Sequence, residues 1–187
     1  MKIGYCFTGS FCTLERSFHV LSGIVRAGHT VLPIMSETVY YTDTRFTVAE
    51  EFSHRVEELT GNPVIHTVAD AEPLGPRIPL DLMITAPCTG NTLSKLSRGI
   101  TDTSVTMAMK AHLRSDRPLL IALASNDALS QNLGSVARLL NRKAVYFVPM
   151  RQDDPVGKPH SLVADFEKVE ECMTLALAGR QMRPLFL

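Results

Sequence analysis

One stretch, residues 81–102, constrains the fold more than any other part of the sequence. Residues 81–86 (DLMITA) are mostly apolar and precede Pro87, as is typical of a buried strand in a parallel sheet. The following TGNT, at 89–92, brings hydroxyls, an amide and a glycine to a helix start. Free N–H groups and the positive end of the helix dipole favour an anion there. An ordinary connection with a Thr or Asn cap explains the pattern about equally well.

Similar units of strand, polar turn and helix recur along the chain. Apolar segments predict further strands at 2–7, 29–35, 118–124 and 145–148. Helical spacing of apolar residues predicts helices at 11–27, at 47–60 with a capping box that begins at Thr47, from 102 or 103 to 113, after 127 to about 142, and from Ser161 or Asp165 onward. This alternation predicts a three-layer α/β/α Rossmann-like fold, with a parallel sheet of about six strands and helices on both faces. We expect one domain over residues 1–187.

Composition excludes several classes of function. Lys+Arg and Asp+Glu are both 19, so no basic excess favours nucleic acid or an anionic membrane. The apolar runs are too short for a signal peptide or a membrane span, which predicts a soluble cytoplasmic protein. The 4 Cys and 6 His residues form no ligand pattern, so free thiols and no metal are expected.

Polar clusters follow four of the expected strands, at residues 8–10, 36–38, 87–92 and 125–127. In parallel sheets, ligands bind outside the carboxyl ends of the strands. These clusters offer neutral hydrogen-bonding groups, which suit one phosphate and a planar polar ring better than a triphosphate with magnesium. Residues 40–46 are interpreted as a loop over the pocket, and Asp153 and Asp154 as turn formers.

Several short elements carry a resemblance to a known family. Residues 87–92 (PCTGNT) resemble the P-A-S-A-N-T element of the homo-oligomeric flavin-containing Cys decarboxylase family of flavoproteins. Lys95, Gly99 and Asp102 match the K-x-x-x-G-x-x-D that follows it, and Asn126 is the one residue kept from the family's P-x-M-N. The phrases FTGS, AEPLGP, SKL, NDAL and QDDP resemble a synthase branch of this family, from spore-forming bacteria.

One departure separates this branch from the decarboxylases. Those enzymes carry a catalytic His in an H-I-x-L element, where this chain has RIPL, beginning at Arg77. Arginine stays charged near neutral pH and cannot act as a base. The resemblance therefore favours the synthase branch over decarboxylation.

The resemblance implies an FMN site at the strand ends. The residues implied to contact the phosphate are Gly9, Ser10, Ser36 and Thr38. The residues implied to contact the ribityl chain and the ring are Pro87, Thr89, Gly90, Asn91, Thr92, Ser125 and Asn126. The implied reaction is the oxidation of a dihydropyridine precursor to pyridine-2,6-dicarboxylate during sporulation, within a homo-oligomer and with an A subunit that carries NADP. Such a substrate calls for cations, for which Arg45, Arg77 and Arg151 are candidates. No catalytic residue is assigned. A decarboxylase and a non-catalytic module that stabilises the A subunit stay as alternatives.

Overall fold

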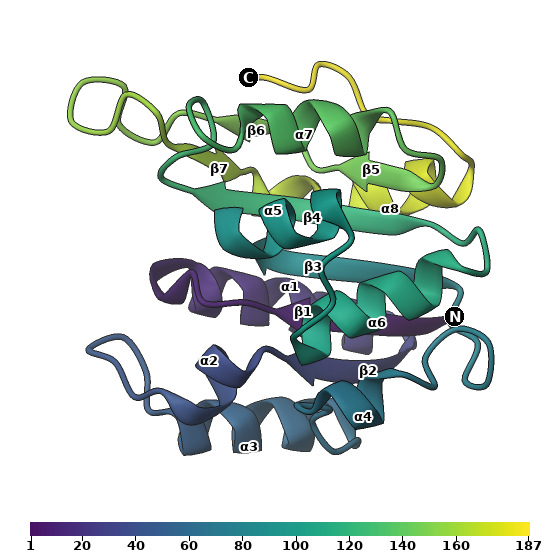
Figure 1. The fold of residues 1–187 in the computed structure, drawn as a ribbon. Coiled ribbons are helices and arrows are strands. Elements are labelled where there is room, and N and C mark those ends of the chain that lie inside the picture. Colours follow the sequence, from purple (N-terminus) through teal and green to yellow (C-terminus); the bar gives the residue numbers. More distant parts are fainter.

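A computed structural model describes residues 1–187 (Figure 1). Its strands are β1 (Lys2–Phe7), β2 (Thr30–Met35), β3 (Leu82–Cys88), β4 (Leu119–Ser125), β5 (Val145–Phe147), β6 (Met150–Arg151) and β7 (Leu162–Ala164). Its α-helices are α1 (Leu14–Arg26), α2 (Glu37–Tyr41), α3 (Ala49–Thr60), α4 (Val68–Ala71), α5 (Gly90–Arg98), α6 (Ser104–Leu113), α7 (Leu133–Leu140) and α8 (Val169–Leu177).

The sheet is mostly parallel, and its strand order places a crevice in the middle. β2, β1, β3, β4 and β5 pair side by side in parallel, in that order. The chain moves outward in one direction from β1 to β2 and in the other from β3 onward, so the connections diverge between β1 and β3. In sheets of this kind the ligand crevice lies at that switch point, beyond the carboxyl ends of the strands. The predicted fold class is confirmed.

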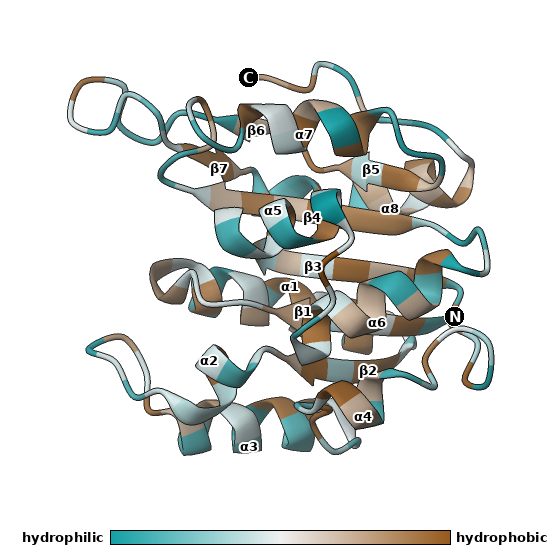
Figure 2. Cartoon of the chain, in the orientation of Figure 1, coloured by the Kyte–Doolittle hydropathy of each residue, from teal (hydrophilic) through white to brown (hydrophobic).

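Helices cover both faces of the sheet because each central strand is apolar on both sides. Along β1, Ile3, Tyr5 and Phe7 belong to the hydrophobic cluster under α1, α3 and α8, whereas Cys6 belongs to the cluster under α4 to α7. Figure 2 shows the result, with hydrophobic strands between helices whose outer surfaces are hydrophilic. Two clusters on one sheet thus hold the strand ends in fixed positions.

The far side of β4 differs from the sequence prediction. The first half of β4 pairs in parallel with β5, and its last two residues pair antiparallel with β7, which pairs in turn with β6. Residues 162–164 therefore form a strand, and the prediction of a helix start at Ser161 is wrong. The alternative start at Asp165 is confirmed, because a 3₁₀ helix at Phe166–Lys168 follows Asp165 and leads directly into α8. A strand of three residues is too short to reveal a period of two.

Two further helix starts were predicted incorrectly. α3 begins after Val48, and the Thr47 hydroxyl donates to the Val48 carbonyl instead of capping the helix. The Asp43 carboxylate accepts from the N–H of Ala49 at 2.9 Å in its place. After β4, residues 127–132 form turns and α7 begins only at Leu133. β3 also continues through Pro87 to Cys88, two residues beyond the predicted end at residue 86.

Three further features are the thiols, the length of the helices and the carboxyl tail. All four cysteines are free, as predicted. None of the helices combines the length and the apolar character that crossing a bilayer requires. The tail packs on its own chain, because the N–H of Leu187 donates to the Met150 carbonyl at 3.0 Å and Leu185 is buried.

Candidate functional site

A cavity of about 920 Å³ lies at the carboxyl end of the sheet. Its walls come from the ends of β1, β3 and β4, from the loop between α2 and α3, and from the hairpin between β6 and β7. The lining residues are Gly9, Ser10, Phe11, Cys12, Thr13, Arg45, Phe46, Thr89, Gly90, Asn91, Ala124, Ser125, Asn126, Asp127, Asp153, Lys158, Ser161 and Val163. The cavity therefore extends across the switch point between β1 and β3.

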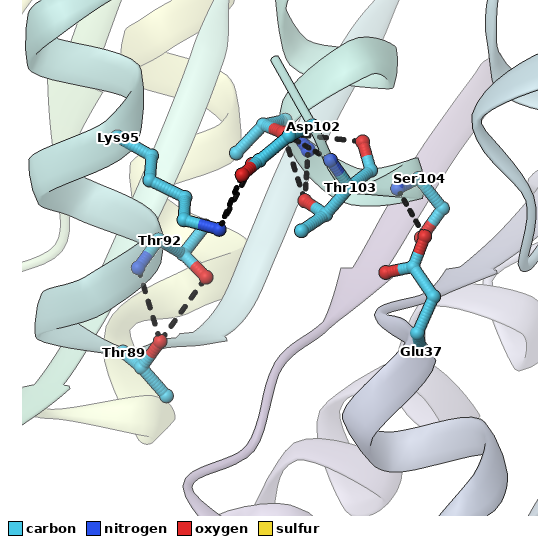
Figure 3. Close-up of polar contacts among 8 residues, drawn as sticks. Glu37, Thr89, Thr92, Lys95, Asp102, Thr103 and Ser104 are labelled. Atoms are coloured by element: carbon cyan, nitrogen blue, oxygen red, sulfur yellow. Dashed lines mark hydrogen bonds and ion pairs between the residues drawn. The ribbon is translucent and has the colours of Figure 1, made fainter. Parts of the chain in front are cut away.

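Thr8 joins the two strands at the floor of this cavity. Its side chain is 1% exposed, and its hydroxyl donates to the Pro87 carbonyl at 2.8 Å. The same oxygen accepts from the N–H of Thr89, also at 2.8 Å. Thr89 in turn caps α5 by accepting from the N–H of Thr92 (Figure 3), as one of the two interpretations of the sequence proposed. The ends of β1 and β3 and the start of α5 thus form one unit.

A carboxylate lies against the first turn of α5. Asp127 accepts a hydrogen bond from the Ser125 hydroxyl and another from the Asn132 side-chain amide at 2.9 Å. Gly90 makes this approach possible, because a Cβ there would lie 2.4 Å from Ser125 Oγ and 2.6 Å from Asp127 Oδ1. The buried Asn132 Oδ1 has no hydrogen-bond partner. Since Asp127 already supplies a negative charge here, the start of α5 suits a neutral group better than a phosphate.

The structure gives the K-x-x-x-G-x-x-D element a supporting role (Figure 3). α5 ends at Gly99, which reverses the chain, so that Asp102 returns to Lys95 with an Nζ to Oδ1 distance of 2.8 Å. Beyond it, the Glu37 carboxylate accepts from the N–H of Ser104 at 2.9 Å and so ties α2 to the start of α6. The family element therefore supports the helices behind the cavity and does not enter it.

The hairpin loop at residues 152–160 forms the opposite wall. Asp154 makes a turn by accepting from the N–H of Gly157 at 2.8 Å, which agrees with its interpretation as a turn former. Asp153 instead faces Lys158, with 2.9 Å between Oδ2 and Nζ. That ammonium group, as the largest influence, holds the pKa of the Asp153 carboxyl below its usual range. This wall is charged, whereas the wall of strand ends is mostly neutral.

The structure brings together most of the predicted cofactor residues. Those in the cavity wall are Gly9, Ser10, Thr89, Gly90, Asn91, Ser125 and Asn126, with Arg45 among the predicted cations. The others lie behind the wall: Thr38 is next to Gly9, Ser36 caps α2, and Pro87 and Thr92 are buried in β3 and α5.

Two predicted cations lie outside the cavity. Arg151 pairs with Asp165 at 2.7 Å, on a neighbouring part of the surface. Arg77 is exposed in the turn before β3, at the end of the sheet where the parallel strands begin. The structure thus does not bring Arg77 to the strand ends within one chain.

Sequence reasoning missed the residues that the hairpin contributes, notably Lys158, Ser161 and Val163. They reach the cavity because Ser125 pairs with Leu162 across an antiparallel ladder that no local pattern predicts. Cys12 and Phe46 were also missed, although both adjoin predicted residues.

The donors of the cavity fit a flavin mononucleotide. The backbone N–H groups of Gly9, Gly90 and Asn91 have no acceptor within the chain. Gly9 lies in the loop after β1, where a Cβ would be nearest to Thr38 and Phe11 and no carboxylate is in contact, so its N–H can serve a phosphate. The N–H groups of Gly90 and Asn91 lie beside Asp127 and suit the carbonyls or nitrogens of a neutral ring.

The chain belongs to the Flavoprotein family, whose model matches residues 1–173. Within that family, it is 40% identical to the B subunit of dipicolinate synthase from Bacillus subtilis over 186 residues, which span 100% of this chain and 93% of the relative. The crystal structure of the corresponding B subunit from Bacillus halodurans is similar with a TM-score of 0.91 and 38% identity, over 100% of this chain and 95% of that one. The predicted family and branch are both confirmed.

A more distant similarity extends to a decarboxylase of the same fold. A dodecameric FMN-dependent UbiX-like decarboxylase from Escherichia coli O157:H7 matches with a TM-score of 0.64 and 22% identity, over 80% of each chain. At that level of identity, the comparison shows a shared fold and nothing about activity.

Proposed function

We propose that the chain binds FMN in the cavity at the carboxyl end of its sheet. The observation that carries this proposal is the position of the cavity, which crosses the switch point between β1 and β3 and offers free N–H groups on both sides. Gly9 and Ser10 hold the phosphate, with Thr38 behind them. Thr89 to Asn91 and Ser125 to Asn126 would hold the ribityl chain and the flavin ring.

We further propose that the chain acts as the B subunit of a dipicolinate synthase, together with an A subunit that carries NADP. Similarity to the two B subunits supports this role. The reaction oxidises a dihydrodipicolinate-type precursor, which loses a hydride and a proton and becomes aromatic. When bound, FMN supplies a hydride acceptor, as the nicotinamide of the A subunit also does. The chain's own residues bind and orient the substrate.

Homo-oligomer formation is part of the same proposal. Phe186 and Leu187 are 51% and 47% exposed at the end of the carboxyl tail, and Leu177 is also exposed on α8. Such an apolar surface suits packing against a second copy of the chain.

Flavin binding is best tested with a glycine substitution that the fold tolerates. A Cβ at Gly9 would meet Thr38 Cγ2 at 3.4 Å, an ordinary contact, so Gly9→Ala should leave the melting temperature unchanged. A ligand that approaches the Gly9 backbone would be displaced, and we expect FMN affinity to fall about tenfold. Fluorescence quenching of added FMN measures this affinity.

A matched control comes from α7. Gly134 has open space around it, so Gly134→Ala should leave FMN affinity unchanged while stabilising the helix by up to about 1 kcal/mol. Wild-type protein that takes up no FMN would overturn the proposed flavin site. If wild-type protein with FMN releases CO2 from a carboxylated thiol instead of oxidising the dihydropyridine, the synthase role fails.

A further inference from the structure

Two cations border the cavity, and they stand at opposite ends of it. Arg45 belongs to the loop between α2 and α3, beyond β2, and Lys158 belongs to the hairpin loop beyond β4 (Figure 1). Arg45 makes no ion pair, whereas Lys158 pairs with Asp153 at 2.9 Å. The two cations therefore differ in both position and surroundings.

Backbone pairing fixes Lys158 beside the wall formed by the end of β4. The N–H of Ser161 donates to the Lys158 carbonyl at 3.0 Å, and the next residue, Leu162, pairs with Ser125. The carbonyl of His160, the residue before Ser161, accepts from the N–H of Leu129 at 2.9 Å. Lys158 thus lies next to the Ser125–Asn126 wall, where the proposed function places the reactive ring.

The loop keeps its shape without the ion pair between Lys158 and Asp153. Asp154 accepts from the N–H groups of Gly157 and Lys158, each at 2.8 Å, and the Gln152 amide donates to the Pro159 carbonyl at 2.8 Å. The paired side chains are 57% and 34% exposed, and ion pairs that exposed contribute little to stability. The ion pair is therefore free to serve something other than folding.

We propose that Lys158 binds a carboxylate of the dicarboxylate substrate, and that Asp153 competes with the substrate for this ammonium group. The inference rests on the proposed function, because it takes the ligand to be a pyridine dicarboxylate. An ammonium group and a carboxylate form a charge-assisted hydrogen bond, and Asp153 already supplies that chemistry from within the chain. Substrate binding exchanges one carboxylate for another at Lys158.

Competition makes an uncommon prediction, in which the two partners of one ion pair have opposite effects. Lys158→Gln should weaken binding of pyridine-2,6-dicarboxylate by about tenfold or more, because a charge-assisted hydrogen bond is lost. Asp153→Asn should tighten the same binding by a few fold, because the competitor is removed. Calorimetric titration of the full chain, with FMN present, measures both. If the ion pair were merely structural, both variants would weaken binding alike, and that result would overturn the proposal.

The chain offers a matched control pair. Lys143 and Asp116 form a similar exposed ion pair at 2.7 Å, next to the starts of β5 and β4 and away from the cavity. Lys143→Gln and Asp116→Asn should leave dicarboxylate binding unchanged. An effect of the control variants as large as that of Lys158→Gln would mean that net charge, and not the position of Lys158, governs binding.

Separate titrations with FMN and with riboflavin, which lacks the phosphate, test whether Lys158 binds a substrate carboxylate or the flavin phosphate. Lys158→Gln should leave the affinity for both flavins unchanged; a selective loss of FMN affinity would assign Lys158 to the phosphate and overturn the proposal. Protein that binds the dicarboxylate through Lys158 but takes up no flavin would remove the flavin site and leave this inference standing. Wild-type protein that binds no dicarboxylate would refute the role of Lys158 while flavin binding could still hold.

Discussion

Polar and charged side chains gather at both ends of the parallel sheet, but the two ends use them differently. At the amino end, where the parallel strands begin, most of the polar groups satisfy one another: Asp81 accepts from the N–H of Lys2 at 2.8 Å, and Arg117 donates to the Leu80 carbonyl at 2.7 Å. At the carboxyl end, the N–H groups of Gly9 and Gly90 have no partner in the chain and face a cavity. Polar residues therefore indicate a binding site only where the fold leaves their hydrogen-bonding groups unused.

The largest expected effect comes from two glycines, one at each end of the sheet. A Cβ at Gly90 would lie 2.4 Å from Ser125 Oγ, and a Cβ at Gly75, where φ is +102°, would lie 2.4 Å from the Ala111 carbonyl oxygen. Each substitution by Ala should lower the free energy of unfolding by about 2–3 kcal/mol, because packed atoms must shift. Urea unfolding measures this loss.

The same two variants distinguish the ends by ligand binding. Gly90→Ala should also weaken FMN binding, since it displaces Ser125 and Asp127 in the cavity wall. Gly75→Ala should leave FMN affinity unchanged at temperatures where the protein is folded. Equal losses of FMN affinity in the two variants would show that the two ends of the sheet are coupled. The claim that only the carboxyl end serves binding would then be wrong.

An intermediate effect concerns His112, a buried histidine near the amino end. Its Nε2 contacts the Pro118 carbonyl at 2.9 Å and its Nδ1 has no partner, so burial lowers the pKa of the ring. The unfolded chain then binds a proton before the folded chain does. Stability should therefore be complete above the ordinary histidine pKa of 6.5 and fall as the pH drops below it.

Unfolding free energies at pH 7.5 and pH 5, measured on the wild type and on His112→Gln, isolate this group from the other histidines. The fall on acidification should be smaller in the variant, whose amide can still donate to the Pro118 carbonyl. His54→Gln is the control, because His54 lies exposed on α3 beside Glu58. An equal fall in all three proteins would exclude His112 as the cause.

The smallest effect concerns two exposed arginines, both of which the sequence indicates as candidates for binding the substrate. Arg45 borders the cavity, whereas Arg77 lies at the amino end of the sheet. Arg45→Ala should weaken pyridine-2,6-dicarboxylate binding by about three- to tenfold, and Arg77→Ala should not change it. Neither should move the melting temperature, since neither side chain is buried. If Arg77→Ala weakened binding and Arg45→Ala did not, the result would indicate that Arg77 reaches the cavity of a second copy of the chain.

Sequence patterns predicted the parallel core because buried strands are continuous apolar runs and each is followed by a turn. The strand-end residues Gly9, Thr89 and Ser125 followed from the same rule, since the carboxyl ends of parallel strands meet. A family motif made Arg77 a candidate, but alignment with a motif gives the order of residues along the chain and not the end of the sheet at which they lie.

The helix starts that differ between prediction and structure are explained by side chains that bond from outside the helix or within the preceding turn. Asp43 caps α3 from outside the helix, at six residues' distance from Ala49, so the nearer Thr47 was an attractive but incorrect choice. Asp127 bonds Ser125 and Asn132 and so delays α7 to Leu133. Both choices depend on neighbours that only the folded chain provides.

The change of partner along β4 gives the molecule two parts that can diverge independently. The parallel strands and α5 form the wall proposed to bind flavin, and the hairpin of β6 and β7 pairs with the sheet at the last residues of β4. Insertions or deletions within residues 152–160 would resize the cavity and relocate its cation while the parallel sheet stays intact. On the proposed function, a family with this architecture can acquire new substrates by remodelling one hairpin while the proposed cofactor site stays unchanged.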